Sequence, residues 1–538
     1  NVLRVAVNRN GLSSNIQTVM FYDGIPEGTL NHRTDYDDII YAVMVDRFFD
    51  GDSGNSIPVV NSNLTQKANY FGGDLQGIID KINDGYFDSL GINTLWLSPV
   101  VDNTDSAYQE YPEPHRYYSG YHGYWPVSSV KVEERFGNLN LLKSIVNDAH
   151  KHSIHILIDY VANHVHKEHP YFKEHRDWFG TLELPDGRLN LRLWDEHRLT
   201  TWFEPFLPKF DYENSREALD TMTDNAVWWL KETDADGFRQ DAVKHIPNIF
   251  WRTLTRKIKS RISVPDHRDI FQIGETFGSY ELVDSYINNG QLNAQFNFNL
   301  YDTAIPVFID PMRSFDELDE QMQKTFDAYG VNNLMGNVMD SHDKVRFMAY
   351  ADGDVSLNAD NAADIGWNNP PVVDHKSSYD KLKLYLSYIL TIPGIPVIDY
   401  GDEIGMTGAA DPDNRRMMRF GNEINDQEKE TLKDVQKLIR IRRENSALRY
   451  GDFYTVKADD NIYAYIRSDL NERVLIVLNK SNNEINTSID FPQLFHINNM
   501  YDLITGQNNP INDHKSEIKL QPIGYSIFKL NYNSIRNE

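Results

Sequence analysis

The sequence contains no cysteine, which removes disulfides, thiolate nucleophiles and cysteine-ligated zinc from consideration together. It also has no run of about 18 apolar residues, so we expect no membrane span. Basic residues are few, with Lys+Arg 53 against Asp+Glu 79 and a formal net charge of -26. Such a chain repels nucleic acid and anionic membranes on average. We therefore expect a neutral or cationic partner and no nucleic acid.

The start of the chain lacks a methionine and a signal-peptide pattern, so we expect a mature or trimmed form. We predict an extracellular, cell-surface or periplasmic location, and the oligomeric state stays open. A length of 538 residues exceeds one ordinary compact domain and predicts a large core with at least one appended domain. Aromatic residues make up 12% of the chain, enough to line a sugar-binding surface as well as to fill a core.

Eight short apolar runs alternate with longer amphipathic stretches from residue 39 onward. This alternation is typical of βα units around a parallel sheet, and eight units predict a closed barrel. The predicted strands are Ile40–Val45, Thr94–Leu97, Ile154–Ile158, Gly237–Arg239, Phe271–Ile273, Ala294–Phe298, Gly336–Met339 and Ile395–Ile398.

The predicted fold class is α/β, a (β/α)8 TIM barrel with two additions. We assign the barrel to residues 37–163 and 215–443, after an N-terminal extension at 1–36. Residues 164–214, rich in His, Trp, Pro and charged side chains, interrupt the spacing and predict a small inserted domain after the third strand. Short alternating strands in residues 444–538 predict a C-terminal antiparallel β-sandwich.

Carboxylates follow four of the predicted strands. Asp159 follows the third strand, Asp241 the fourth, Glu275 the fifth and Asp343 lies just past the seventh. We expect them to converge, because active sites of such barrels form at the C-terminal ends of the strands. Glycoside hydrolysis needs an ionised carboxylate to attack the anomeric carbon and a protonated one to donate to the leaving oxygen. A third carboxylate nearby would raise the pKa of the acid.

Four segments resemble the α-amylase family, glycoside hydrolase family 13, and the resemblance extends over roughly residues 39–530. The segments are Asp159–His164, Gly237–His245, Gly274–Glu275 and Ser341–Asp343.

The resemblance implies a retaining hydrolase that cleaves α-1,4-glucosidic bonds in starch, maltodextrins or related α-glucans. Asp241 would be the nucleophile, Glu275 the general acid/base, and Asp343 the carboxylate that helps to distort the sugar and stabilise the transition state. A retaining pair should lie about 5–5.5 Å apart. Arg239, two residues before Asp241 on the same face of the strand, is well placed to keep Asp241 ionised.

Two loops resemble the family's sugar-binding loops. In Tyr121–Trp125, Tyr124 would stack on the sugar and His122 would bond its hydroxyls; the alternative is an aromatic turn packed into the barrel rim. In the loop after the eighth strand, Asp411 and Arg415 would grip hydroxyls of the same sugar; the alternative is a solvated charged loop. The remaining predicted substrate contacts are His164, Lys244 and His342.

A structural calcium ion is the predicted cofactor. The run Asp50–Asn55 supplies hard oxygen ligands on a flexible turn, as calcium prefers. It resembles the calcium loop of cyclodextrin glucanotransferases and neopullulanases, in which the Gly72 carbonyl and Asp74 would complete the shell. The alternative is a solvated turn. The predicted ligands are Asp50, Asp52, Asn55, Gly72 and Asp74.

Two other metal sites receive a different interpretation. A second calcium near Asn163, common in α-amylases, conflicts with Lys209, because Lys209 stands where those enzymes carry an aspartate ligand and its ammonium can take the ion's place. His164, His166 and His169 suggest zinc, but the H-E-x-x-H spacing is absent and the retaining mechanism needs no catalytic metal.

Two alternative functions remain. A sugar hydroxyl replacing water would make the protein an α-glucan transglycosylase or a trehalose-synthase-like enzyme. The motifs are mixed, since Val243–His245 is like α-amylases and cyclodextrin glucanotransferases, whereas Leu207–Lys209 is nearer neopullulanases. The other alternative is a non-catalytic glucan-binding protein on the same barrel, because fold does not fix function.

Overall fold

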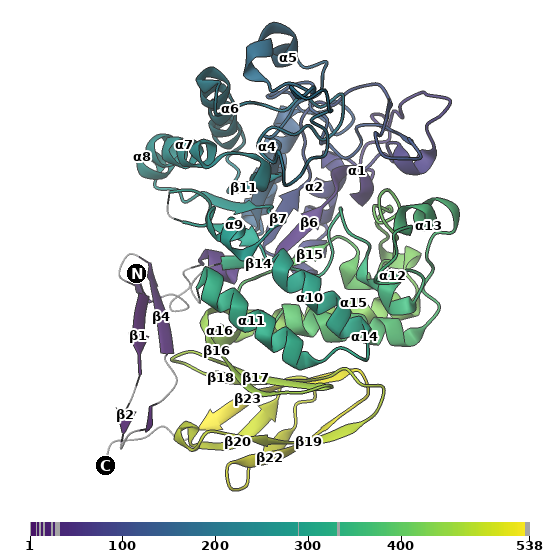
Figure 1. Cartoon of the computed structure of the whole chain (residues 1–538). Helices are drawn as coiled ribbons and strands as arrows, with labels where there is room; N and C mark the ends of the chain where they lie inside the picture. The colour runs from purple at the N-terminus through teal and green to yellow at the C-terminus, as the bar shows by residue number, and fades with distance from the viewer. Residues whose placement is uncertain are drawn as a thin grey trace.

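A computed structural model describes residues 2–6, 8–9, 12–13, 17–22, 25–26, 33–288, 290–330 and 334–532. Its centre is a closed barrel of parallel strands in the order β10-β11-β12-β13-β14-β15-β6-β7 (Figure 1), which confirms the predicted fold class. The strands are β6 (Ile40–Val43), β7 (Thr94–Leu97), β10 (His155–Tyr160), β11 (Gly237–Gln240), β12 (Phe271–Gly274), β13 (Ala294–Phe296), β14 (Leu334–Val338) and β15 (Ile395–Asp399).

Some strands end earlier than their apolar runs suggest, and β6 ends at Val43, two residues before the predicted end at Val45. β13 stops at Phe296, two residues before the predicted end at Phe298. Asn297 begins a helix instead, because its side chain accepts a hydrogen bond from the backbone N–H of Leu300. Phe298 is therefore the first residue of α10, and its ring is buried beside the barrel.

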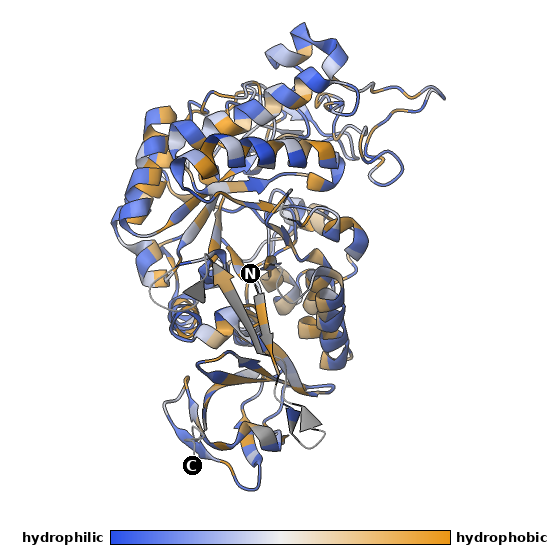
Figure 2. Ribbon diagram, turned by 90° about the vertical axis from the view of Figure 1, so that its left-hand side faces the viewer, coloured by the Kyte–Doolittle hydropathy of each residue, from blue (hydrophilic) through white to orange (hydrophobic). Residues whose placement is uncertain are grey.

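Helices surround the barrel, and the longer ones bury an apolar face. In α4 the buried residues are Leu142, Ile145, Val146 and Ala149, the spacing of one helical face. Figure 2 shows the same banding of hydrophilic and hydrophobic residues along the other helices. The barrel helices are α1 (Val45–Phe48), α2 (Leu75–Asn83), α3 (Tyr86–Leu90), α4 (Leu139–Lys151), α6 (Arg216–Thr233), α7 (Asn248–Ile258), α8 (Val264–Asp266), α9 (Tyr280–Asp284), α10 (Phe298–Ile309), α11 (Phe315–Tyr329), α12 (Phe347–Asp352), α13 (Ala362–Asn368), α14 (Lys376–Ile389) and α15 (Asp426–Glu444).

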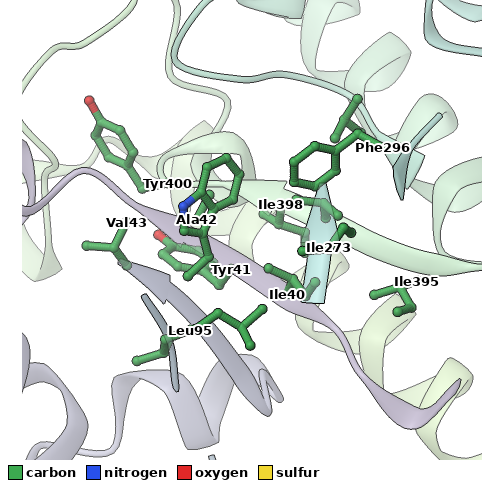
Figure 3. Close-up of a cluster of buried hydrophobic side chains, with 14 of the residues drawn as sticks. Ile40, Tyr41, Ala42, Val43, Leu95, Ile273, Phe296, Ile395, Ile398 and Tyr400 are labelled. Atoms are coloured by element: carbon green, nitrogen blue, oxygen red, sulfur yellow. The ribbon is translucent and has the colours of Figure 1, made fainter. Parts of the chain in front are cut away.

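The barrel strands are buried on both faces, which explains why they read as unbroken apolar runs. All four residues of β6 and all four of β7 are buried. Figure 3 shows side chains of β6 gathered with Ile273, Phe296 and Ile398 from strands that are distant in the sequence. This packing fixes the strand ends that carry the polar residues.

Two segments extend the barrel rim on the side of the strand C-termini. Residues 161–215, between β10 and α6, contain the short helix α5 (Pro170–Glu174) at the top of Figure 1. The rings of Phe179 and Phe210 stack at 4.4 Å and close this inserted segment. Between β7 and α4, β8 (Tyr108–Gln109) and β9 (Tyr117–Tyr118) form a small hairpin.

The C-terminal region forms two antiparallel layers (Figure 1). Tyr463 and Tyr465 of β17 face the barrel helices, whereas the alternate residues Ile462, Ala464 and Ile466 face the second layer. The larger sheet contains β16 (Asp452–Ala458), β17 (Ile462–Ser468), β18 (Arg473–Asn479), β23 (Gly524–Tyr532), β20 (Ile497–Asp502) and β21 (Asn508–Pro510), after helix α16 (Ser446–Tyr450). The second layer pairs β19 (Ile485–Asp490) with β22 (Lys515–Leu520).

The N-terminal segment contributes short strands beside these sheets (Figure 1). They are β1 (Val2–Val5), β2 (Asn8–Arg9), β3 (Leu12–Ser13), β4 (Gln17–Tyr22) and β5 (Ile25–Pro26). Within the described residues, no helix has the length and apolar character needed to cross a bilayer.

Candidate active site

A cavity of about 530 Å³ opens at the C-terminal ends of the barrel strands. Apart from Arg239, every residue predicted to be catalytic or substrate-binding lines it. These residues are His122, Tyr124, His164, Asp241, Lys244, Glu275, His342, Asp343, Asp411 and Arg415.

Arg239 lies beneath the cavity and contacts three carboxylates. Its Nη1 donates to both oxygens of Asp159 at 3.1 Å and to Oδ1 of Asp241 at 2.8 Å. Its Nη2 lies 2.9 Å from Oε2 of Glu275. The contact follows from register, because β10, β11 and β12 are parallel neighbours with Asp159 directly opposite Arg239. One guanidinium therefore holds Asp241 and Glu275 at the same end of adjacent strands.

The charges in this cluster divide the carboxylates into two kinds. Burial raises the pKa of Asp241 to about 6, since the lowering by Arg239 is partly offset by Asp159. Burial also raises the pKa of Glu275, and the nearby charges of Asp241 and Asp343 add to the rise against Arg239. Asp343 behaves differently: burial disfavours its charge, but His342 and Arg415 outweigh burial and lower its pKa. At neutral pH, Glu275 thus lies among anions that favour its protonated form.

Asp343 is fixed by two cationic partners. Arg415 Nη2 lies 3.1 Å from Oδ1, and His342 Nε2 lies 3.1 Å from Oδ2. Arg415 also pairs with Asp411 at 3.0 Å and donates through Nε to the backbone carbonyl of His342 at 2.8 Å. The loops after β14 and β15 are therefore joined at the pocket wall, and Asp411–Arg415 is not a solvated loop.

The aromatic turn reaches the same carboxylates. Tyr124 donates its hydroxyl to Asp159 at 2.8 Å, and its ring stacks on His342 at 5.3 Å. The neutral imidazole of His164, whose pKa burial lowers to about 4, hydrogen-bonds through Nε2 to the Tyr124 carbonyl at 2.9 Å. His122 accepts a bond from the backbone N–H of Tyr124 at 3.0 Å. The turn therefore contributes pocket wall rather than rim packing alone.

Several lining residues escaped the sequence prediction. Phe277 follows Glu275 by two residues, and this spacing after a strand end is the one available signal. The others come from irregular segments with no periodicity to mark them. They are Glu110, Tyr118, Trp125, Arg192, Trp194, Asp195, Phe203, Glu204, Leu207, Ala242 and His245. Lys244, which was predicted, lies 3.4 Å from Asp195 through its Nζ.

The predicted calcium loop is folded around Asp74. Its carboxylate caps α2 through Gly77 N at 2.7 Å and accepts Asp52 N at 2.9 Å and Asn55 Nδ2 at 3.1 Å. Asn55 Oδ1 is buried without a hydrogen-bond partner. Gly72 has a positive φ of 98°, and a Cβ added there would lie 2.7 Å from Ser56 Oγ and 3.1 Å from the Asp50 carboxylate, so the position favours glycine.

These features fit a cation bound by oxygen ligands. Asn55 Oδ1 is a buried acceptor without a hydrogen-bond partner, and the lack of a side chain at Gly72 lets a ligand come close to its backbone. The acidic side chains alone do not form a site: in the described part of the chain, no three His, Cys, Asp or Glu side chains converge as metal ligands. His164, His166 and His169 each use a ring nitrogen in a hydrogen bond within the protein. His169 Nε2 pairs with Ser129 at 3.1 Å, and His166 Nδ1 accepts the N–H of Glu168.

Lys209 occupies the junction between the inserted segment and the barrel. It is fully buried, and its Nζ donates to the Phe210 carbonyl at 3.0 Å. The main chain of Lys209 bridges to His164, beside Asn163, whose Oδ1 has no hydrogen-bond partner. Burial lowers the pKa of Lys209 to about 7. Lys209 therefore lies between the inserted segment and the barrel, and its replacement of a second ion stays a prediction.

Comparison with known proteins gives two domain matches. Residues 42–434 match the alpha amylase catalytic domain, and residues 453–527 match the maltogenic amylase C-terminal domain. A cyclomaltodextrinase of Geobacillus thermopakistaniensis is 28% identical over 91% of this chain and 76% of its own length. A cyclomaltodextrin glucanotransferase of Geobacillus stearothermophilus is 29% identical over 84% of this chain and 61% of its own length.

Solved structures of α-amylases are also similar to this chain. An Anoxybacillus α-amylase superposes with a TM-score of 0.78 at 30% identity, covering 94% of this chain and 100% of that one. An α-amylase from Geobacillus thermoleovorans, solved with acarbose, gives 0.76 at 28% identity over 94% and 100% of the two chains. The catalytic-domain match spans most of the barrel, including every carboxylate at the pocket floor. The chain therefore belongs to the α-amylase family of glycoside hydrolases.

Proposed function

We propose that this protein hydrolyses α-1,4-glucosidic bonds of maltodextrins, starch or related α-glucans with retention of configuration. The observation that carries the proposal is the shared guanidinium: Arg239 contacts Asp241 at 2.8 Å and Glu275 at 2.9 Å at the floor of a cavity. The names of the relatives, which include cyclomaltodextrinase, maltogenic α-amylase and α-amylase, support the same bond and substrate class.

In the first step, a carboxylate oxygen of Asp241 attacks the anomeric carbon as the bond to the leaving oxygen breaks. Glu275 gives its proton to that oxygen, so the shortened glucan leaves as an alcohol and a β-glucosyl ester remains on Asp241. In the second step, Glu275 takes a proton from water, the water oxygen bonds to the anomeric carbon, and the ester breaks. Two inversions restore the α configuration.

The pocket supports this division of labour. Arg239 keeps Asp241 ionised near neutral pH, whereas burial and neighbouring anions favour a proton on Glu275. Asp343, kept ionised by His342 and Arg415, faces the cavity as an acceptor for sugar hydroxyls. Hydrogen bonds of this kind strengthen as positive charge develops on the ring.

A transglycosylase is the second candidate, favoured by the cyclomaltodextrin glucanotransferases among the relatives. It uses the same glucosyl ester, and a sugar hydroxyl replaces water in the second step. Chromatography of products from maltotriose separates the two reactions: hydrolysis gives only shorter sugars, whereas transfer also gives longer ones.

The first prediction concerns the paired carboxylates. D241N should abolish turnover of maltodextrin, because no ester can form, and E275A should be slowed by at least about 100-fold on the same substrate. With an aryl maltooligosaccharide whose leaving group needs no proton, azide should restore turnover to E275A and give an α-glycosyl azide. D241N should gain no α-glycosyl azide.

Circular dichroism and thermal unfolding would establish that both variants are folded. Full activity of D241N, or a β-glycosyl azide from E275A, would contradict the assigned roles. Unchanged turnover in both folded variants would mean that a different active centre catalyses the reaction.

We also propose that the loop around Asp74 binds structural calcium. The unsatisfied Asn55 Oδ1 and the open approach at Gly72 support this second prediction. Chelation should lower the melting temperature, since an ion that binds only the folded state stabilises it by mass action. Added calcium should restore the wild type but not N55A, and magnesium should restore it poorly. A melting temperature indifferent to chelator would reject the site.

A further inference from the structure

A short hairpin borders one end of the pocket. We define it as residues 108–118, which comprise β8, β9 and the turn between them. Tyr108 pairs with Tyr118 across the hairpin, and Glu110 N donates to the Arg116 carbonyl at 2.9 Å. The backbone N–H of Arg116 in turn donates to the Glu110 carboxylate at 3.1 Å. Glu110 and Tyr118 both line the cavity.

One side of the 108–118 hairpin is attached to the inserted segment. Tyr111 N donates to Glu204 Oε2 at 2.8 Å, and Glu204 is itself paired with Arg192. Tyr108 donates its hydroxyl to Glu168 at 2.6 Å and packs its ring 4.7 Å from Phe206. The turn of the hairpin therefore contacts Glu204, which also lines the cavity.

The other side of the hairpin is attached to α13, which belongs to the long loop after β14. Arg116 forms an ion pair with Asp364, and its guanidinium lies 4.8 Å from the ring centroid of Trp367. Tyr118 meets the same ring edge-on at 6.0 Å. Lys67 also holds α13 in place, because its Nζ donates to two backbone carbonyls of that helix, each at 2.9 Å. The hairpin thus bridges the inserted segment and α13 across the rim.

The contacts of the pocket residues identify which end is bridged. Glu275 protonates the leaving oxygen, so the departing part of the glucan lies on its side. The donor sugar lies on the side of Asp343, which Arg415 joins to Asp411 through contacts of 3.1 Å and 3.0 Å. Tyr118 lies at the Asp411 end, because Tyr121, three residues further along the same segment, donates its hydroxyl to Asp411 Oδ1 at 3.1 Å. The hairpin therefore stands beyond the donor sugar.

We infer that the 108–118 hairpin closes the donor end of the cleft, so that the enzyme takes short maltooligosaccharides or chain ends and cuts at a fixed distance from the non-reducing end. This inference rests on the proposed function. Glu110 offers a carboxylate to the hydroxyls of the terminal sugar, and Tyr118 offers an aromatic wall. A cavity of about 530 Å³ suits a few sugar rings rather than a long chain that passes through.

The test compares two maltoheptaoses labelled with a fluorophore at the reducing end. One has a free non-reducing end, and the other carries a 4,6-O-benzylidene cap there. We expect the capped sugar to be cleaved with a kcat/KM lower by about 100-fold or more, because the cap meets Glu110 and Tyr118. The free sugar should give one dominant labelled product early in the reaction.

Equal cleavage of the two sugars, or an early spread of labelled products over all lengths, would overturn the inference while leaving α-glucan hydrolysis intact. Cleavage of neither sugar would overturn the proposed function, and the inference with it.

Two variants test whether the hairpin causes the preference for the sugar with a free non-reducing end. W367A removes the ring on which Arg116 and Tyr118 pack, and R116A removes the ion pair with Asp364. Each should reduce the preference for the free sugar by about 10-fold or more. R188A, which breaks an exposed ion pair elsewhere in the inserted segment, is the matched control and should keep the wild-type ratio.

Should W367A fail to fold, R116A and the wild-type comparison still decide the question. A folded R116A with the wild-type preference for the free sugar would show that the hairpin does not close the cleft, and the inference would be rejected.

Discussion

Arg239 determines the geometry of the carboxylate cluster through the shape of its side chain. A guanidinium is a planar fork with five donors, so one residue can contact Asp159, Asp241 and Glu275 from three successive strands. A lysine ammonium is a point charge on a flexible stem and satisfies fewer partners at fixed angles. Because Arg239 carries one positive charge among three buried carboxylates, burial still raises the pKa of Asp159, Asp241 and Glu275.

Lys209 allows a prediction about stability and pH. Its folded pKa is lowered to about 7 by burial, below the ordinary value of 10.5. The unfolded chain therefore binds a proton that the folded chain disfavours, and stability is lost as pH falls from the ordinary pKa through the folded one. K209M removes this loss, so at pH 7 its free energy of unfolding should exceed that of the wild type by a few kcal/mol. Its melting temperature should be correspondingly higher.

Thermal unfolding at pH 7 and near pH 10 checks this. The advantage of K209M should shrink as the pH approaches 10, because the folded amine is already neutral and the unfolded one, with its ordinary pKa of 10.5, begins to lose its proton. A K209M protein that is less stable at pH 7 would mean that a charged ammonium is needed at the junction. K231M, on the exposed face of α6, is the matched control.

The residues of the site differ in how far the sequence could specify them. Asp241 and Glu275 follow apolar strands, and the barrel brings all strand ends to one face, so their meeting follows from topology. Glu110 and Trp194 lie in irregular segments whose path depends on tertiary contacts such as those to Arg116. No period in the sequence marks them. Trp96 Nε1, which donates to Asp159 at 3.0 Å, was read only as part of a strand.

At the scale of elements, the strands were predictable because each is buried on both faces. Thr94–Leu97 coincides with β7, and Ile395 begins β15 as expected. An observed strand end differs from the predicted one where a side chain hydrogen-bonds the backbone and starts another element. Asn297 does this at the end of β13, where it caps α10. The 108–118 hairpin was not predicted, since its paired strands span only two residues each.

The loops after β14 and β15 are joined by a buried arginine. Arg346 donates through Nε to the Asn414 carbonyl at 2.7 Å. It pairs with Asp399 at 3.2 Å and with Asp402 at 3.3 Å. Since one loop carries Asp343 and the other Arg415, the position of both groups at the pocket depends on this junction.

R346M should therefore lower both stability and activity. Removing the guanidinium leaves buried carboxylates without a partner, at a cost of about 3–5 kcal/mol. We expect a lower melting temperature and, in the folded fraction, a reduced kcat. R216M, which removes an exposed ion pair with Asp220 at the start of α6, is the control and should lose about 1 kcal/mol or less. Equal melting temperatures for the two variants would refute the role of Arg346.

At the scale of the whole molecule, the C-terminal sheets are joined to the barrel by buried cations and aromatic rings. Tyr463 of β17 lies 6.2 Å from Tyr388 of α14, and Thr391 hydrogen-bonds Tyr465 at 2.5 Å. Arg442 of α15 donates to the carbonyls of Leu390 and Gly394, which precede β15. The sequence indicated two domains, but this shared boundary depends on residues far apart in the chain.

Arg467 is the cation that crosses this boundary. It lies on β17 and donates to the carbonyls of Thr391 at 2.5 Å, Leu448 at 2.9 Å and Gly451 at 2.9 Å. Its side chain is fully buried, and burial lowers its pKa to about 10 against the raising effects of Tyr465, Asp452 and Asp469. Arg467 therefore ties the C-terminal sheet to the segment that leads into the last barrel strand.

R467M should uncouple the two regions. R467M leaves buried carbonyls without hydrogen-bond donors, at a cost of about 2–4 kcal/mol in total. This cost destabilises the interface rather than the core of either region. We expect one calorimetric transition in the wild type to broaden or split into two, with the sheets unfolding first. K519M, which removes an exposed ion pair with Glu484 in the second layer, should retain a single transition. A single R467M transition at the wild-type temperature would mean that the aromatic contacts alone couple the domains, because the barrel and the sheets would then still unfold together.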